Sequence, residues 1–262
     1  MARAAFFDAV RSSLFGGSLS KEQVDGMEAL LDAGQRYELT NPHHMANVLA
    51  QVYHETGTHM LGIKETVMPS HKDKNPSDAT VIDRLDRAYA KGQLPWVKTP
   101  YWRDGWFGRG PIMATHKANY EKLGKRIGVD LVKNPNLAMD RNIGASIAMI
   151  GMKEGMFTGK KLADYNFPAA IDAPVKSNPR RIVNGQDGTD AKVAGYHRAF
   201  YSALVAMGWP ETVPPKPAQP PKPAPAPTPS PSAPAQPNGS AGAVLAIIAV
   251  ILAAVSYFIF GR

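Results

Sequence analysis

Residues 41–57, which read NPHHMANVLAQVYHETG, form the stretch that decides the fold of this chain. Asn41 is a preferred N-cap residue, and Pro42 suits the first helical position, where a missing N–H costs nothing. The apolar residues recur at helical spacing and predict a stripe that faces the core; they are Met45, Val48, Leu49 and Val52. The stretch therefore predicts a buried helix, with Gly57 as its stop.

Two glutamates follow this stripe. Glu55 lies three residues beyond Val52, at the buried edge of the helix, where desolvation favours the protonated carboxyl that a general acid needs. Glu65 comes ten residues later, beyond a turn that Gly57 and Gly62 permit. The spacing allows the two carboxyl groups to face each other across a cleft. A simpler interpretation also stands, in which Glu55 is a solvated flank and Glu65 a surface ion-pair partner.

His54 and His59 raise the alternative of a zinc site around Glu55. A zincin helix needs two histidines four residues apart on one face, whereas these two are five apart with Gly57 between them. The chain has no cysteine, which excludes disulfides and thiolate zinc sites. We therefore expect neither a metal nor another cofactor.

The composition indicates one folded domain over residues 1–209. Helices are expected near residues 4–15, from a capping box at Ser20 and Gln23 to Gly34, and near residues 79–91, 144–152 and 193–207. The predicted fold is mostly α. The chain has 30 Lys+Arg against 22 Asp+Glu, and this excess is spread along it, so charge does not choose among nucleic acid, cell-wall polymer and membrane surface.

Residues 66–104 read as irregular segments around one helix, and aromatic residues are concentrated there and just beyond. Flat aromatic rings stack on sugars, but they also anchor cores and loops, and the sequence leaves both roles open. The residues concerned are Trp96, Tyr101, Trp102 and Trp106.

Residues 106–120 read WFGRGPIMATHKANY, in which Gly108 and Gly110 allow a close backbone approach around Arg109. Other motifs precede and follow in a fixed order: HETG at 54–57, IGVDL at 127–131, NPNLA at 134–138 and RIVNG at 181–185. This order resembles glycoside hydrolase family 19, which comprises lysozyme-like chitinases and phage endolysins. The similarity covers most of residues 40–205 and implies a lysozyme-like helical catalytic domain.

The resemblance implies a role for each matching residue. Glu55 matches the general acid and Glu65 the general base of an inverting hydrolysis, which needs the two carboxyls about 6.5–9.5 Å apart. Thr115 matches the hydroxyl that helps to hold the attacking water. The residues expected to contact substrate are Asn119, Asn184, Arg109, Tyr120 and Trp106. For Arg109, an ion pair that holds the site together is an equal alternative.

The sequence departs from the family pattern in two places. Met113 and Ala114 stand where the family usually has Gln and Leu, which removes one amide contact to substrate. After the RIVNG motif, plant chitinases carry a further Glu and Arg; the only candidates here are Asp187, Asp190 and Arg198. These departures argue more strongly against a plant-type chitinase than against an endolysin.

We therefore expect cleavage of β-1,4 bonds in peptidoglycan, with chitin as the alternative substrate and no nucleic-acid partner. A non-catalytic glycan-binding virion protein is the alternative from another functional class. Retention of Glu55, Glu65 and Thr115 argues against that alternative.

The C-terminal part of the chain changes character. Residues 210–240 are rich in proline and predict a linker. Residues 241–260 carry no charge and are long enough to span a bilayer, which predicts a transmembrane helix. No signal peptide is visible at the N-terminus. The expectation is a single-pass C-terminal anchor in a host inner membrane or a virion membrane.

Overall fold

The computed structural model describes residues 2–210, which are mostly helical, as the sequence predicts. Seven α-helices and one two-stranded sheet, with several short 3₁₀ helices, make up the regular structure of this part of the chain. The α-helices are α1 Ala2–Ser13, α2 Lys21–Arg36, α3 Pro42–Glu55, α4 Asp78–Ala90, α5 Lys117–Ile127, α6 Arg141–Glu154 and α7 Asp190–Met207.

Helix α3 begins as predicted. The Asn41 side chain accepts a hydrogen bond of 2.9 Å from the backbone N–H of His43, and Pro42 is the first helical residue. The four stripe residues are fully buried. Burying a side chain of this size stabilises the fold by about 2 kcal/mol, so the stripe fixes which face of α3 meets the core. The helix ends at Glu55.

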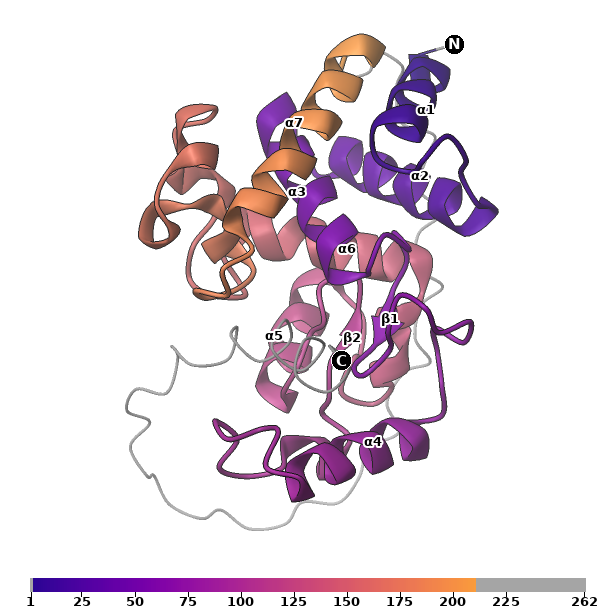
Figure 1. Cartoon of the computed structure of the whole chain (residues 1–262), viewed down its shortest axis with the longest axis vertical. Helices are drawn as coiled ribbons and strands as arrows, with labels where there is room; N and C mark the ends of the chain where they lie inside the picture. The colour runs from indigo at the N-terminus through magenta and orange to yellow at the C-terminus, as the bar shows by residue number, and fades with distance from the viewer. Residues whose placement is uncertain (1, 211–262) are drawn as a thin grey trace.

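Helices from the two ends of the described chain surround α3. Figure 1 shows α7 running beside α3, with α1 close by and α6 crossing beneath them. The rings of Phe6 in α1 and Phe200 in α7 stack with their centroids 6.4 Å apart. Trp209 closes the core beyond α7, where its indole N–H donates to the Leu39 carbonyl at 3.0 Å.

Helix α2 confirms its predicted start and corrects its predicted end. Ser20 and Gln23 form the expected reciprocal capping box. Gly34, however, does not stop the helix, which continues to Arg36. A Cβ on Gly34 would lie 2.7 Å from the Met45 sulfur. Because Gly34 has no side chain, α2 can pack closely against α3 at this position.

A short antiparallel sheet, not predicted from the sequence, joins two distant segments. Strand β1 (Ile63–Lys64) pairs with β2 (Arg109–Gly110), with Ile63 opposite Gly110. Beyond the pair, the Glu65 N–H donates to the Gly108 carbonyl at 2.8 Å. Two-residue strands carry no periodic signal, so only the folded chain reveals that residue 65 lies beside residue 108.

The segment around α4 has its own apolar cluster, which contains Val81, Leu85, Trp102 and Phe107. Trp102 is fully buried, and its indole N–H donates to Asp86 at 2.9 Å. Of the two roles open to the aromatic residues of this region, Trp102 takes that of a core anchor.

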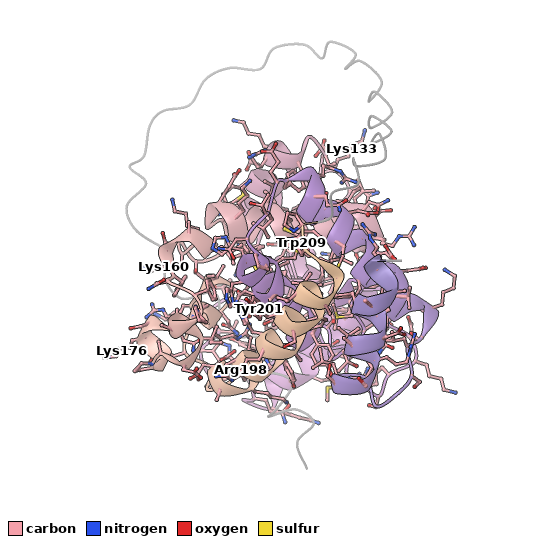
Figure 2. All side chains as sticks on the ribbon, turned by 90° about the horizontal axis from the view of Figure 1, so that it is seen from above. Lys133, Lys160, Lys176, Arg198, Tyr201 and Trp209 are labelled. Carbon is pink, nitrogen blue, oxygen red and sulfur yellow. The ribbon has the colours of Figure 1, made fainter. Side chains whose placement is uncertain are left out.

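Basic side chains are distributed around the molecule. In Figure 2, Lys133 lies at one part of the periphery, and Lys160 and Lys176 lie at another. Several arginines are paired with carboxylates, among them Arg126 with Glu154 at 2.6 Å.

The predicted membrane anchor requires a correction. Within residues 2–210, no helix combines the length and the apolar character needed to cross a bilayer. The predicted span, residues 241–260, and all but the first residue of the predicted linker, residues 210–240, lie outside the described residues. The single-pass anchor, and the localisation inferred from it, are therefore not supported.

Candidate active site

A cleft of about 480 Å³ lies where the end of α3 faces the turn after β1. Both predicted catalytic glutamates line it. They are joined by side chains from segments far apart in sequence: Thr66, Met113, Arg180 and Tyr196.

Glu55 is the last residue of α3, and only 5% of its side chain is exposed. Its Oε1 atom lies 2.6 Å from Nη2 of Arg180. Arg180 therefore places a positive charge directly beside the Glu55 carboxyl group.

Arg180 is fully buried in the short 3₁₀ helix η6 (Pro179–Ile182) and binds a second carboxylate, that of Asp187. Arg180 donates to Asp187 through Nε at 3.0 Å and Nη2 at 2.7 Å. Its Nη1 atom donates to Gln51 on α3 at 2.6 Å. Burial acts to lower the pKa of Arg180, but the charges of Glu55 and Asp187 raise it.

Asp187 is the second carboxylate partner of Arg180. It also accepts hydrogen bonds from the Asn184 amide and from the hydroxyl and backbone N–H of Thr189. Burial acts to raise the pKa of Asp187, but Arg180 and Thr189 outweigh it and lower the pKa. Asp187 therefore balances the charge of the buried Arg180.

Glu65 occupies a different environment. Its side chain is fully buried; Oε1 accepts from the Tyr101 hydroxyl and Oε2 from the Gly108 N–H, both at 2.7 Å. Burial raises the pKa of Glu65, against the opposing effects of Gly108, Tyr101 and Arg109. A carboxylate with a raised pKa binds a proton more strongly, which suits a general base.

Thr115 lies behind Gly108. It precedes α5, and its hydroxyl donates to the Met113 carbonyl at 2.8 Å. A Cβ on Gly108 would lie 3.3 Å from the Thr115 hydroxyl and 3.5 Å from Oε2 of Glu65. The glycine therefore allows Thr115 and Glu65 to approach each other. Thr115 is not among the residues that line the cleft.

The two predicted substrate amides also lie away from the cleft lining. Asn119, in the first turn of α5, donates to the Thr115 carbonyl at 2.8 Å. Asn184 is buried; its amide nitrogen donates to Asp187 at 3.0 Å, and its oxygen accepts from the Gly185 N–H at 2.7 Å. The structure thus places Asn184 in the network that holds Arg180.

Arg109 takes the ion-pair role that the sequence left open. It is buried and donates to Asp78 at 2.8 Å and to Asn136 at 3.0 Å, and its guanidinium carbon lies 3.6 Å from the centre of the Phe107 ring. These contacts join α4, β2 and η2 (Pro135–Met139). The side chain has no surface with which to reach a sugar.

The two aromatic residues that are expected to contact substrate, Tyr120 and Trp106, pack against other parts of the protein. The buried Tyr120 hydroxyl donates to the Phe107 carbonyl at 2.8 Å. Trp106 is half-buried, with its ring centroid 5.6 Å from that of Tyr120. Neither residue lines the cleft.

Sequence reasoning missed Arg180 and the role of Tyr101. Arg180 stands next to Arg181, and nothing in the sequence says which of the two is buried. A local signal was present: Asn178 caps η6 by accepting from the Arg180 N–H at 2.9 Å, and a cap before proline marks a helical turn. Tyr101 was singled out only as an aromatic, whereas its hydroxyl is the group that binds Glu65.

Comparison with known proteins supports the family resemblance over part of the chain. Residues 33–153 match the family model described as chitinase class I. Among curated relatives, an acidic 27 kDa endochitinase of Solanum lycopersicum is 46% identical over 97 residues, which cover 31% of this chain and 37% of the relative. An acidic endochitinase of Solanum chilense is 58% identical over 36 residues, 13% of this chain and 14% of the relative.

Among solved structures, chitinase C from Streptomyces griseus aligns over 79% of this chain and 76% of its own, with 20% identity and a TM-score of 0.47. The chain matches less than two fifths of the length of the two curated relatives. The family match contains Glu55, Glu65 and Thr115, whereas Arg180 and Asp187 lie beyond it. Over residues 33–153, which are less than half of its length, the chain is thus similar to the family described as chitinase class I.

Proposed function

We propose that this cleft hydrolyses β-1,4 glycosidic bonds of peptidoglycan with inversion at the anomeric carbon. The observation that carries the proposal is that Glu55 and Glu65 line one cleft from two different elements, in two different environments. Catalysis by two carboxyl groups requires such an asymmetry, because one must give a proton while the other takes one.

Each carboxyl group has a defined part in the proposed reaction. Glu55 donates its proton to the glycosidic oxygen as the bond from that oxygen to the anomeric carbon breaks. Glu65 removes a proton from a water molecule that attacks the same carbon from the opposite face. The reaction leaves Glu55 ionised beside Arg180 and Glu65 protonated. Arg180 thus stabilises the charge that Glu55 acquires.

Chitin is the second candidate substrate, because the curated relatives are named endochitinases. Met113 bears on this choice. It lines the cleft at the position where the family usually has glutamine, so the wall there offers a thioether in place of an amide. Without this polar contact, the site relies more on its remaining groups to hold a sugar. Because this departure argues more strongly against a plant-type chitinase than against an endolysin, peptidoglycan remains the first proposal.

The test compares wild-type protein with Glu55→Gln on purified bacterial walls and on chitin in parallel. The amide keeps the shape of the side chain but has no proton to give, so activity should fall at least about 100-fold with little change in melting temperature. Glu121→Gln, at an exposed position on α5, is the matched control.

Proton NMR of the fresh product then gives its anomeric configuration. Inversion is expected when Glu65 acts through water. The proposal fails if Glu55→Gln keeps more than a tenth of the activity, or if wild-type protein cleaves neither polymer. Relative rates on walls and chitin decide between the two substrates.

A further inference from the structure

One lysine differs from the other charged residues that line the cleft. Lys192, in the first turn of α7, is exposed on the cleft lining. Glu65 and Arg180, which also line the cleft, are buried. In the part of the chain that the structure describes, no carboxylate pairs with Lys192. Asp190 is two residues away on the same helix, and residues at that spacing do not face each other.

Helix α7 places Lys192 near the catalytic end of α3. Tyr196 lies four residues after Lys192, on the same side of α7, and also lines the cleft. The Tyr196 ring packs against Tyr53 of α3, with centroids 4.6 Å apart, and its centroid lies 6.4 Å from that of His54. His54 directly precedes Glu55. The side of α7 that faces the cleft is therefore fixed beside the end of α3, as the course of the two helices in Figure 1 also shows.

The charge of Lys192 acts on the same end of α3. Burial lowers the pKa of His54, and the charges of Arg180 and Lys192 act in the same direction, against those of Glu55 and Asp187. Electrostatic effects weaken with distance, so this contribution places the Lys192 ammonium group near the residue that precedes Glu55. The cleft thus presents an unpaired positive charge to a substrate that is bound beside Glu55.

We propose that Lys192 binds a carboxylate of peptidoglycan and thereby favours this polymer over chitin. The inference rests on the proposed function and names a residue that discriminates between its two candidate substrates. Peptidoglycan carries carboxylates on its stem peptides, and on muramic acid residues that lack a stem, whereas chitin is a neutral polymer of N-acetylglucosamine. An ammonium group gains a charge-assisted hydrogen bond from a carboxylate and no comparable interaction from a neutral sugar.

Lys192→Gln provides the direct test, because glutamine removes the charge and keeps a polar side chain. On purified walls we expect the apparent KM to rise about 3- to 5-fold, as for the loss of one exposed ion pair, with kcat changed less than about twofold. Lys192→Arg keeps the charge and should retain the wild-type KM. Lys160→Gln, at an exposed position outside the cleft lining, is the matched control for the loss of one positive charge.

Neutral substrates separate the binding of a carboxylate from other effects of the substitution. On chitin, and on walls whose carboxylates have been converted to methylamides, wild-type protein and Lys192→Gln should have the same KM. Glycan strands freed of their stem peptides then identify the carboxylate. A difference between the two proteins that persists on these strands assigns it to muramic acid, and a difference that is lost assigns it to the stem; either result supports the proposal.

The failure of this inference can be told apart from that of the proposed function. If wild-type protein does not cleave walls, the proposed function fails and this inference fails with it. If wild-type protein cleaves walls and Lys192→Gln changes KM no more than Lys160→Gln does, only the role of Lys192 is wrong. An equal rise of KM on untreated and on neutralised walls would also overturn that role, because the lost interaction would then not involve a carboxylate.

Discussion

At the scale of single residues, Arg180 joins the two parts of the candidate site. It holds Glu55 from α3 and Asp187 from the segment before α7, and it reaches Gln51 as well. Its charge lies fully inside the protein, where it is stable only because these partners surround it. Glu55 therefore belongs to a network of charged and polar groups that extends well beyond the α3 helix.

Replacing Arg180 should destabilise the fold as well as the reaction. Arg180→Met leaves Asp187 without its cation, and breaking a buried pair in this way costs about 3–5 kcal/mol. Urea unfolding followed by circular dichroism measures the loss. The control is Arg181→Met, because the neighbouring arginine is only half-buried and donates to the Lys176 carbonyl; it should cost less than about 1 kcal/mol. Equal effects at the two positions would contradict the assignment of Arg180 as the buried partner.

At the scale of secondary-structure elements, glycines set how closely helices approach other segments. Gly26, inside α2, faces the backbone of Met60: a Cβ at this position would lie 2.4 Å from the Met60 carbonyl oxygen. That contact fixes α2 against the segment that connects α3 to β1. The position of the Glu65 turn thus depends in part on a glycine in another helix.

Gly26→Ala and Gly195→Ala form a matched pair within helices. Alanine raises helix propensity by about 1 kcal/mol relative to glycine at either site. Gly195 in α7 has open space around its Cα, so its substitution should stabilise by roughly that amount. At Gly26 the methyl group meets backbone, and overpacking should outweigh the gain, for a net loss of about 1–2 kcal/mol. The urea concentrations at the unfolding midpoints of the two variants measure the difference in stability. If Gly26→Ala is more stable than wild-type protein, the segment around Met60 can move to make room for the methyl group.

At the scale of the whole molecule, the contact between α3 and α7 contains a pair of histidines. His43 Nδ1 lies 3.2 Å from His197 Nε2, and the His43 ring stacks on Tyr201 with centroids 3.9 Å apart. In Figure 2, Tyr201 and Arg198 lie along α7. Burial lowers the pKa of His197 to about 3, with smaller effects from His43 and Arg198. The folded protein therefore holds His197 neutral.

This lowered pKa makes stability depend on pH in a defined direction. The unfolded chain binds a proton at His197 near its usual pKa of 6.5, whereas the folded chain resists it until about pH 3. The stabilisation is thus complete above pH 6.5 and is lost as pH falls, by about 1.4 kcal/mol per unit. Between pH 7 and pH 4.5 we expect His197 to contribute a loss of about 3 kcal/mol in the free energy of unfolding.

Urea unfolding at several pH values, with wild-type protein and His197→Phe, isolates this contribution. Phenylalanine does not titrate and keeps a ring beside Phe167. The variant should lose distinctly less stability than wild-type protein between pH 7 and pH 4.5, whatever its stability at pH 7. Parallel pH profiles for the two proteins would show that His197 is not the group responsible.

The sequence by itself determined most helices of residues 2–210, with α5 as the exception, and it singled out the two glutamates. The cap at Asn41 and the apolar stripe of α3 are local signals, because capping and helical periodicity act over a few neighbouring residues. The same holds for the capping box at Ser20. The placement of Glu55 at the end of a buried helix followed from these signals alone.

Only the tertiary structure decided what surrounds the two carboxyl groups. Arg180 meets Glu55, and Tyr101 meets Glu65, across 125 and 36 positions of sequence. Such contacts depend on how helices and turns pack, which no local pattern encodes. The same packing buried Arg109 and Asn184 away from the cleft, because burial is a property of the assembled core and not of a motif.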